Sequence, residues 1–476
     1  MVRPAANRGF RMPAPKKPLG LPPGPSSKEA RRFFRRGSLE GTPEFLAWAA
    51  GRYGGVSQFK LFVRRFWSVS DPDAVRDVLV TKARSFVKSR GNQRLRVLLG
   101  DGLLTSEEPL HLRQRRLMQP AFHRERIAQY AAAMVDETRR EIAAWNDGEP
   151  FDVAASMMRM TLAIAARTLF GANVSDVSDE VRAALATAME MFPRMLAPGS
   201  ELLDRMPLPS VRRFWTARAR LDAIIYRMIA QRRANGTDER DLLSMLLTAR
   251  DGQDGATMTD RQVRDEALTI FLAGHETTAV ALTWTLYLLS LHPEVRDRLQ
   301  AEVDTVLGGR AATFEDYAGL SYARNVLTEA MRLYPPAWII GRRAVEDVEI
   351  GGYRMRRNDI ALISSWVTHR DPRFYGDPEA FVPGRWEATP VESLPRFAYY
   401  PFGGGNRVCI GEPFAWLEGV LALATIAQRW RLTLVPGTPV ATMPSVTLRA
   451  KYPMPMTPHS RSAAVAADTN GQVLVL

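Results

Sequence analysis

The sequence predicts a mainly α-helical protein, with a large helical body and a smaller β-rich portion. The clearest indication is the stretch 259–291, whose second half is apolar nearly all round, as expected of a central buried helix. Short strand patterns appear near the start and in the last third of the chain. No Ser/Gly-rich linker or repeat divides the interior, so one large domain with a sizeable core is expected.

The two ends of the chain are predicted to be tails around a single domain over residues 22–461. Residues 1–36 hold ten Lys and Arg against one acid, a net +9 of the formal +13. This concentration indicates a flexible, Pro-rich basic tail over residues 1–21, and disfavours a nucleic-acid-binding surface. The alternative to a solvated tail is a tail that contacts anionic lipid or an acidic protein partner. Residues 462–476 carry few structural cues.

Neither a membrane anchor nor a secretory signal is predicted, because no apolar stretch of sufficient length opens the chain. The acid-poor tail also leaves a transit peptide open as an interpretation. A single cysteine gives no disulfide framework and fits a reducing compartment, so a cytoplasmic location is expected.

Five stretches predict the β-rich portion, and in chain order they cover residues 55–71, 348–355, 360–366, 431–435 and 446–449. The first is expected to form a pair of strands, after which Asp71-Pro72-Asp73 begins a helix, since proline is tolerated in a first helical turn. The second is expected to form a hairpin.

Residues 259–291 are predicted to form one long helix. Thr259 or Asp260 can cap its start, acids at 265–266 crowd its first half, and a His-Pro pair stops it. A membrane-spanning role is excluded because the uninterrupted apolar run is too short and Glu276 stands at its edge.

The long helix contains Ala-Gly-His-Glu-Thr-Thr at residues 273–278. A mid-helix glycine costs about 1 kcal/mol relative to alanine, so it usually has a packing or functional reason. One interpretation is that Gly274 only lets another group approach and that Thr277 bonds to a helix carbonyl. The other is that the hydroxyl of Thr277 and the carboxylate of Glu276 pass protons through water.

Cys409, the one cysteine, lies in the segment Phe-Gly-Gly-Gly-Asn-Arg-Val-Cys-Ile-Gly over residues 402–411. A lone cysteine is usually a small buried hydrophobe. These glycines, however, suit a backbone folded tightly around the sulfur, with N–H groups pointing at it. Glu412-Pro413 then begins a helix, whose N-terminus favours an anion. A thiolate held in this way is a metal ligand or a nucleophile.

The histidines favour a metal. A cysteine nucleophile normally has a histidine partner, and none of the six histidines is near Cys409 in sequence, although a distant one could fold beside it. One thiolate does not build a zinc cage. A single axial thiolate for haem iron remains.

The segment around Cys409 resembles the cysteine-ligand signature of the cytochrome P450 family, F-x-x-G-x-R-x-C-x-G, at Phe402, Gly405, Arg407, Cys409 and Gly411. The resemblance implies the cytochrome P450 fold and a haem b whose iron takes Cys409 as its ligand. Phe402, Arg407 and Gly411 then belong to the haem-binding segment.

Residues 273–278 are similar to the oxygen-binding segment of the same family, A/G-G-x-D/E-T. The resemblance implies that Gly274 leaves room for dioxygen and that Thr277 donates a hydrogen bond to it. Glu276 would relay protons from solvent.

Glu329 and Arg332 stand i, i+3 on a helix that ends at a proline pair. Such a spacing is weak alone, because most pairs of this kind lie on the surface. It resembles the E-x-x-R helix of the family, and residues 381–386 resemble its P-E-R-F segment. That segment departs from the pattern, with Gly384 in place of glutamate and tryptophan in place of phenylalanine. It still supplies Arg385 as the third member of a structural charge cluster.

Basic residues in three places are expected from the resemblance to bind the haem propionates. His111 and Arg115 stand i, i+4 on one helix face, where family members have W/H-x-x-x-R. Arg407 precedes the cysteine, and Arg342 lies where the family often has another arginine, with Arg343 an equal alternative. Arginine suits a carboxylate because its fork binds both oxygens.

The resemblance implies a bacterial-type soluble haem-thiolate monooxygenase that inserts one oxygen atom from O2 into an apolar small molecule, such as a fatty acid, terpenoid or steroid. Electrons are expected from a ferredoxin and its NAD(P)H reductase, because one cysteine cannot hold a Cys-ligated cluster. A monomer is expected. The alternatives are a peroxide-dependent or oxygen-rearranging haem-thiolate enzyme, disfavoured by Glu276-Thr277, and a non-catalytic haem protein, disfavoured by Gly274.

Substrate contacts are expected from the resemblance at residues 86–104 and 189–208, and at Ala273, Ala337, Ile339, Ile340 and Val446. For each residue, packing in the core is the more common role. The sequence leaves the identity of the substrate open.

Overall fold

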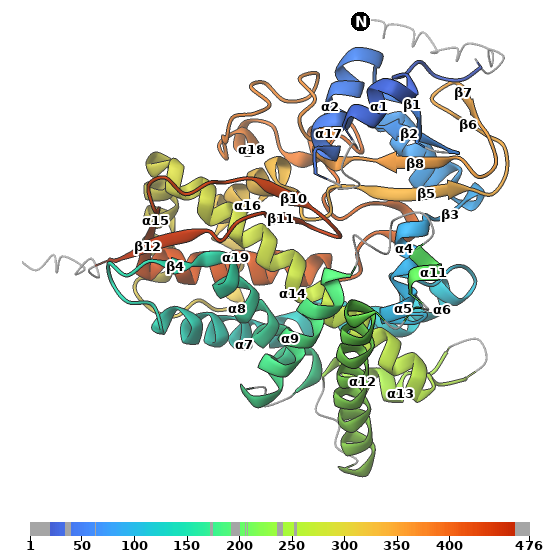
Figure 1. Ribbon diagram of the computed structural model, residues 1–476. Helices are drawn as coiled ribbons and strands as arrows, with labels where there is room; N and C mark the ends of the chain where they lie inside the picture. Colours follow the sequence, from blue (N-terminus) through green and yellow to red (C-terminus); the bar gives the residue numbers. More distant parts are fainter. Residues whose placement is uncertain are drawn as a thin grey trace, which may run out of the picture.

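The computed structural model describes residues 20–33, 40–61, 63–171, 175–191, 200–204, 206, 208–235, 241–251 and 255–461 (Figure 1). Most of this chain is helical, and a smaller sheet-rich part lies with α1 and α2 at the top of the view. The mainly α-helical fold class is thereby confirmed. Of the two predicted tails, only residues 20–21 fall within the described ranges.

Helices dominate the order of elements along the chain. They are α1 (Ser27–Phe33), α2 (Thr42–Tyr53), α3 (Pro72–Arg76), the π-helix η1 (Asp77–Thr81), α4 (Arg90–Arg94), α5 (Arg96–Leu99), α6 (Leu110–Met118), α7 (Arg124–Ala143), α8 (Val153–Phe170), α9 (Ser175–Glu190), α11 (Ser200–Leu203), α12 (Pro209–Asn235), α13 (Leu242–Thr248), α14 (Asp260–Leu291), α15 (Pro293–Leu307), α16 (Ser321–Leu333), α17 (Ser365–Thr368), α18 (Arg385–Ala388) and α19 (Glu412–Arg429). The strands are β1 (Val56–Leu61), β2 (Arg64–Val69), β3 (Phe86–Lys88), β4 (Phe151–Asp152), β5 (Ile340–Ala344), β6 (Val348–Ile350), β7 (Tyr353–Met355), β8 (Ile360–Ile363), β9 (Trp430–Leu434), β10 (Thr442–Pro444), β11 (Leu448–Ala450) and β12 (Pro455–Ser460).

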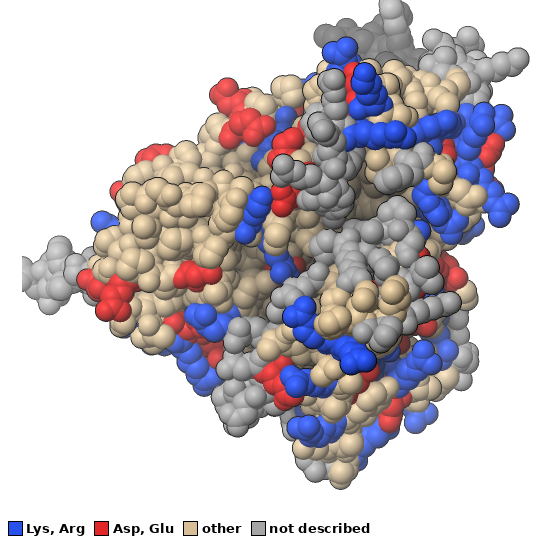
Figure 2. Space-filling model, in the orientation of Figure 1, with Lys and Arg blue, Asp and Glu red and all other residues tan. Residues whose placement is uncertain are grey.

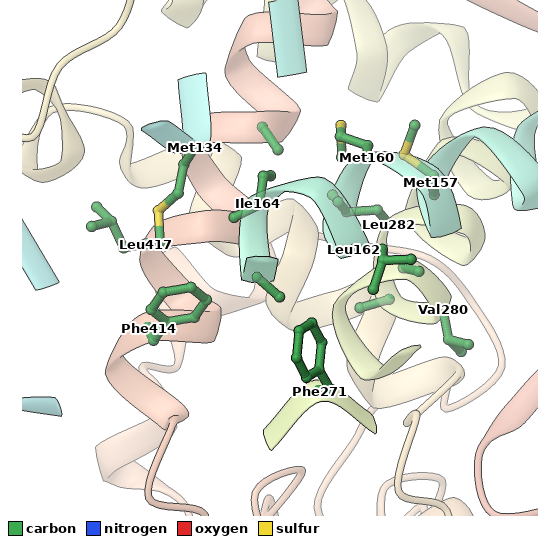
Figure 3. Packing of buried hydrophobic residues seen from close by; sticks show 14 of the residues in the cluster. Met134, Met157, Met160, Leu162, Ile164, Phe271, Val280, Leu282, Phe414 and Leu417 are labelled. Atoms are coloured by element: carbon green, nitrogen blue, oxygen red, sulfur yellow. The ribbon is translucent and has the colours of Figure 1, made fainter. Parts of the chain in front are cut away.

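Helix α14 runs through the helical body, packed against α8, α12, α16 and α19. Thr259 caps it in a capping box with Gln262, and the helix ends before Pro293, as predicted. Side chains of α7, α8, α14 and α19 interdigitate in the core (Figure 3), among them Met134, Met157, Met160, Leu162, Ile164, Phe271, Val280, Leu282, Phe414 and Leu417. Within the described ranges, every helix is too short or too polar to cross a bilayer.

The two acids near the start of α14 bind a loop and do not merely mark a helix start. Asp265 Oδ2 accepts a hydrogen bond from the Asp101 N–H at 2.9 Å, and Glu266 Oε2 accepts one from the Leu103 N–H at 2.9 Å. Gly100 has φ +61°, and a Cβ there would lie 2.2 Å from the Asp265 carboxylate. The loop therefore follows the surface of α14 closely, and only glycine fits at this point.

The main sheet has the strand order β1-β2-β8-β5-β3, in which only the β2–β8 pair is parallel. The predicted strand pair over 55–71 is confirmed as β1 and β2, and the hairpin over 348–355 as β6 and β7. Strands β4, β12 and β9 form a second sheet, and β10 and β11 form a hairpin. The last predicted strand, 446–449, is displaced, because Val446 and Thr447 lie in the turn before β11.

The predicted strand over residues 360–366 is wrong at its end. Strand β8 stops at Ile363, and the short helix α17 begins at Ser365. The hydroxyl of Ser364 donates to the Trp338 carbonyl at 3.2 Å and that of Ser365 to the Ala337 carbonyl at 2.9 Å. These contacts with a distant segment turn the chain away from the sheet and override the strand propensity of the apolar residues that follow.

The residues of the predicted charge cluster meet around the buried Glu329, with Arg332 also buried and Arg385 15% exposed. Arg332 binds both oxygens of this carboxylate at 2.9 Å, and Arg385 Nε lies 3.1 Å from Oε1. Arg332 also donates to the carbonyls of His369 and Ala380 at 2.9 and 2.8 Å. The side chains of Glu329 and Arg332 have no exposed surface. The network therefore ties the end of α16 to the segment 369–385.

The face in Figure 2 carries basic and acidic side chains in close alternation over α12 and α13. A uniformly basic surface of the kind that binds nucleic acid is not seen over these helices. At the upper right of the same view, over β1, β2, β6 and β7, the charged side chains are mostly basic.

Replacing Glu329 by glutamine is expected to lower the free energy of unfolding by about 3–5 kcal/mol, because two buried arginines lose their anion. Urea unfolding followed by circular dichroism measures the loss. Glu387→Gln is the matched control, since Glu387 pairs at 2.6 Å with the exposed Arg298 and should cost less than about 1 kcal/mol. Equally small losses in the two variants would contradict a structural role for the cluster.

Glu418 is a buried acid on α19 that the sequence analysis did not single out. Its side chain is 1% exposed and bonds to Thr278 of α14, while Oε2 has no hydrogen-bond partner among the described residues. Burial raises the pKa of Glu418 to about 8. The folded protein therefore keeps this carboxyl protonated at neutral pH.

The protonated state of Glu418 makes stability depend on pH. In the unfolded chain this carboxyl ionises near its ordinary pKa of 4.5, whereas in the folded protein it ionises near 8. The free energy of unfolding therefore falls as the pH rises between these values. Glu418→Gln is expected to make that fall smaller in urea titrations at pH 5 and 8. An unchanged slope, equal to that of Glu387→Gln, would show that Glu418 is not protonated in the folded state.

Candidate functional site

Cys409 lies in a loop that packs tightly against its neighbours before α19 begins. Gly405 has φ +68°, and a Cβ there would lie 2.0 Å from the Leu79 carbonyl oxygen of η1. A Cβ on Gly404 would lie 2.3 Å from the Phe397 ring. These two glycines therefore allow close packing, which differs from the prediction that they let N–H groups point at the sulfur.

The groups that point at the sulfur come from the start of α19. The N–H groups of Gly411 and Glu412 donate to the sulfur of Cys409, at a helix N-terminus as predicted. Burial nevertheless raises the pKa of the thiol to about 11. A metal cation beside the sulfur would reverse this effect and favour the thiolate.

Cys409 is solvent-accessible although protein surrounds it on every side. Both observations hold together only for a residue that lines an interior space. The ring of Phe402 in the same loop is half-buried and lies 5.6 Å from the Trp416 ring of α19. The loop is thus braced against the helix that carries the sulfur's hydrogen-bond donors.

Basic side chains from distant parts of the chain meet near Cys409. Arg115 of α6 donates from Nη1 to the Val408 carbonyl at 2.7 Å. Arg407 binds Glu107 at 2.5 Å and the Ser106 carbonyl at 3.1 Å. His111, one turn before Arg115 on α6, is buried. The sequence predicted this gathering of His111, Arg115 and Arg407.

Arg342 joins the basic group and Arg343 does not. Arg342 pairs across strands with Lys88 of β3, and Lys88 is buried. Arg343 instead donates to the Asn358 side chain at 3.1 Å on the outer side of the sheet. The geometry therefore favours Arg342 over Arg343, which the sequence left as equal candidates for binding a haem propionate. Lys88 was missed; a lysine within the apolar strand pattern at 86–88 is the signal that could have found it.

The basic groups repel one another. Burial, and then the charge of Arg407, lower the pKa of Lys88 to about 7 and that of His111 to about 4. The same two causes lower the pKa of Arg342 to about 10. The region around Arg407 thus holds more basic groups than its carboxylates balance. A bound anion would therefore be stabilised there. This charge and the accessible thiol fit a haem, which carries carboxylates and an iron.

Three residues of the oxygen-binding segment lie on the middle of α14. Gly274 is half-buried, and the Thr277 hydroxyl donates to the Ala273 carbonyl at 2.7 Å. This is the hydrogen bond to a helix carbonyl that the first interpretation of Thr277 predicted. Glu276 is buried, accepts a hydrogen bond from Arg449 Nε at 2.8 Å and forms an ion pair with Arg449 Nη2 at 2.7 Å.

The partners of Glu276 were missed. Arg449 and Thr447 both reach it from the β10–β11 hairpin, more than 170 residues later in the chain. The only signal in the sequence was the prediction that Val446, three residues before Arg449, contacts the substrate.

The expected substrate contacts line elements around α14. Ala273 of α14 and Ala337 are exposed, and Ile339, Ile340 of β5 and Val446 are half-buried. The range 86–104 forms β3, α4 and α5, so it is not a simple loop. Of the range 189–208, residues 192–199, 205 and 207 lie outside the described residues.

Comparisons with known proteins agree with this arrangement. A family model described as Cytochrome P450 matches residues 31–455. Cyclooctatin synthase of Streptomyces melanosporofaciens is 40% identical over 420 residues, which cover 88% of this chain and 91% of the relative. Cyclooctat-9-en-7-ol 5-monooxygenase of the same organism is 40% identical, with 83% and 86% covered. Pentalenene oxygenase of Streptomyces avermitilis is 38% identical, with 78% and 82% covered.

The similarity extends to solved structures. The crystal structure of the cytochrome P450DA heme domain superimposes with a TM-score of 0.85 at 28% identity, covering 94% of this chain and 99% of that one. The residues matched by the family model include the segment around Cys409 and the whole of α14. The chain therefore belongs to the cytochrome P450 family.

Proposed function

We propose that this monooxygenase inserts one atom of O2 into an apolar cyclic hydrocarbon of the terpenoid type, with haem b as its cofactor. Electrons would come from a separate ferredoxin and its NAD(P)H reductase. The observation that carries the proposal is the Cys409 thiol, accessible inside the protein at the N-terminus of α19 and close to a group of basic side chains. A thiolate can bind the iron of a haem, and the basic side chains can bind its carboxylates.

Cys409 would be the iron ligand, with its sulfur held by the N–H groups of Gly411 and Glu412. When bound, the haem supplies the activation of oxygen, and electron donation from the thiolate favours O–O cleavage. Phe402 would pack beside the cofactor. The side chains that would hold its carboxylates are Lys88, His111, Arg115, Arg342 and Arg407.

The overall reaction, RH + O2 + 2 H⁺ + 2 e⁻ → ROH + H2O, needs protons delivered inside the protein. Glu276 and Thr277 are neighbours on α14 and supply a carboxylate and a hydroxyl for that transfer. Gly274 leaves space one turn earlier on the same helix. The Thr277 hydroxyl would have to exchange its bond with the Ala273 carbonyl for a bond to oxygen or water.

The substrate class is supported by the relatives and by the residues around α14. The relatives' names give a cyclic alkenol and pentalenene as the compounds acted on. The residues that would contact such a molecule are Ala273, Ala337, Ile339, Ile340 and Val446, all of them aliphatic and accessible. Such a lining orients an apolar ligand and excludes stray water.

A separate electron donor is supported by the cysteine content, because one cysteine cannot serve both as an iron ligand and in a Cys-ligated cluster. A ferredoxin fed by an NAD(P)H reductase is the simplest source. The monomeric state and the cytoplasmic location stay predictions.

Turnover tests the function. The haem-loaded protein is incubated with cyclooctat-9-en-7-ol or pentalenene, NADPH, a surrogate ferredoxin and its reductase under ¹⁸O2. The expected product is an alcohol that carries one labelled oxygen. Product formed only with hydrogen peroxide would support the peroxide-dependent alternative, and no oxygenated product under either condition would contradict the terpenoid assignment.

The rate of haem loss tests whether the basic side chains hold the cofactor. Arg342 and its neighbour Arg343 provide a matched pair of variants. Arg342→Gln is expected to speed haem loss about tenfold or more, because a charge-assisted hydrogen bond contributes about 1.5–3 kcal/mol. Arg343→Gln should leave the rate unchanged, since Arg343 bonds to Asn358. The rate of haem transfer to an excess of apomyoglobin measures both. Equal rates in the two variants would show that Arg342 does not hold the cofactor.

A further inference from the structure

The buried carboxylate of Glu276 is held at one oxygen by two side chains of a distant hairpin. Its Oε1 accepts hydrogen bonds from Arg449 Nε at 2.8 Å and from the Thr447 hydroxyl, and it forms an ion pair with Arg449 Nη2 at 2.7 Å. No described residue donates to Oε2. The Glu276 side chain is 2% exposed, whereas that of Arg449 is 28% exposed. Arg449 therefore extends from the buried acid toward solvent.

The hairpin that presents these side chains is firmly anchored. Thr447 and Arg449 alternate with Leu448, so they point to one side while Leu448 packs on the other with no exposed surface. The Leu448 N–H donates to the Pro336 carbonyl at 3.0 Å, and its carbonyl accepts from Trp284 Nε1 at 2.8 Å. At the turn, the Ser445 carbonyl accepts from Trp338 Nε1 at 3.2 Å.

These anchors fix the hairpin to α14 itself, because Trp284 lies two turns after Glu276 on that helix. Thr447 and Arg449 thus approach Glu276 from a frame that cannot move independently of it. An anchored frame of this kind sets the rotamer of a side chain more strictly than a flexible surface partner does. A surface ion pair would not need the second donor or the buried anchors.

We propose that Arg449 and Thr447 are positioning residues for proton delivery, which hold the Glu276 carboxylate in one orientation with Oε2 available for the moving proton. The proposal rests on the proposed role of Glu276. Arg449 supplies the compensating charge that a buried carboxylate needs, and Thr447 sets the direction of the carboxyl plane. A proton from solvent water would bind to Glu276 and leave it toward Thr277, so that the carboxylate is regenerated in each cycle.

The test compares Glu276→Gln, Arg449→Leu, Arg449→Lys and Thr447→Val in the haem-loaded protein, with Arg343→Gln as control. Oxygen consumption is followed with NADPH, a surrogate ferredoxin–reductase pair and cyclooctat-9-en-7-ol as probe. Guaiacol oxidation driven by hydrogen peroxide is measured in parallel, because peroxide brings its own protons. Arg449→Leu is expected to slow NADPH-driven oxygen consumption about tenfold, and to leave the peroxide-driven rate within about twofold. The slowing is smaller than the roughly 10²–10⁴-fold that a proton-transfer group itself contributes, because Arg449 only positions that group. Arg449→Lys and Thr447→Val should lie between Arg449→Leu and the unaltered protein.

Urea unfolding supplies a readout that is independent of activity. If Arg449 acts through Glu276, the variant carrying both Glu276→Gln and Arg449→Leu should unfold at the same urea concentration as the less stable single variant. Additive losses would show that the two side chains are not coupled and would contradict the proposal.

The outcomes separate the two claims. A normal rate of oxygen consumption in Glu276→Gln would overturn the proposed role of Glu276 itself. A slow Glu276→Gln with normal Arg449→Lys, Arg449→Leu and Thr447→Val would overturn only the positioning role. Equal losses in the NADPH-driven and peroxide-driven rates would also overturn it, because a merely structural role affects both. If Arg449→Leu does not fold, Arg449→Lys and Thr447→Val decide the question.

Discussion

The crowding of basic side chains near Cys409 is the constraint around which this interior is organised. Burial, and then the charge of Arg407, lowers the pKa of Lys88, of His111 and of Arg342, so these cations are costly to hold together inside the chain. A bound dicarboxylate relieves that repulsion, and a cation at the sulfur reverses the raised pKa of Cys409. The charge of the protein and the charge of the proposed cofactor are thus complementary. Cofactor binding and the stability of this region are expected to depend on each other.

Helix α14 connects that region to the rest of the molecule. Near its start Asp265 and Glu266 hold the loop after α5, in its middle stand Gly274 and Thr277, and Glu276 binds the β10–β11 hairpin. One helix therefore fixes a loop, the proposed oxygen-binding segment and the hairpin in a single frame. The buried cluster around Glu329 does the same for α16 and the segment before the Cys409 loop.

The sequence predicted what local patterns encode. Capping residues and prolines predicted both ends of α14 and the start of α19, and short motifs singled out Cys409, Glu276 and the cluster around Glu329. Contacts between distant segments were not predictable, because no pattern marks a pairing over such separations. The side chains that only these contacts reveal are Lys88, Glu418, Thr447 and Arg449. The glycines before Cys409 were expected to let N–H groups point at the sulfur, whereas in the structure they allow close packing. The sequence could not predict this reason, because the approach of Leu79 to Gly405 depends on where the helix η1 lies in the fold. The end of β8 was misjudged because hydroxyl contacts to residues 337–338 redirect the chain.

The central claim is that Cys409 binds the haem iron as a thiolate. The most direct measurement is the absorption spectrum of the reduced carbon monoxide complex, recorded for the unaltered protein and for Cys409→Ala and Cys409→His. The unaltered protein is expected to show the strongly red-shifted Soret band that a thiolate ligand gives, and both variants are expected to lose it, while Cys409→His retains haem with a histidine-type band. A thiolate-type band that persists in Cys409→Ala, or one that is absent from the unaltered protein, would contradict the account.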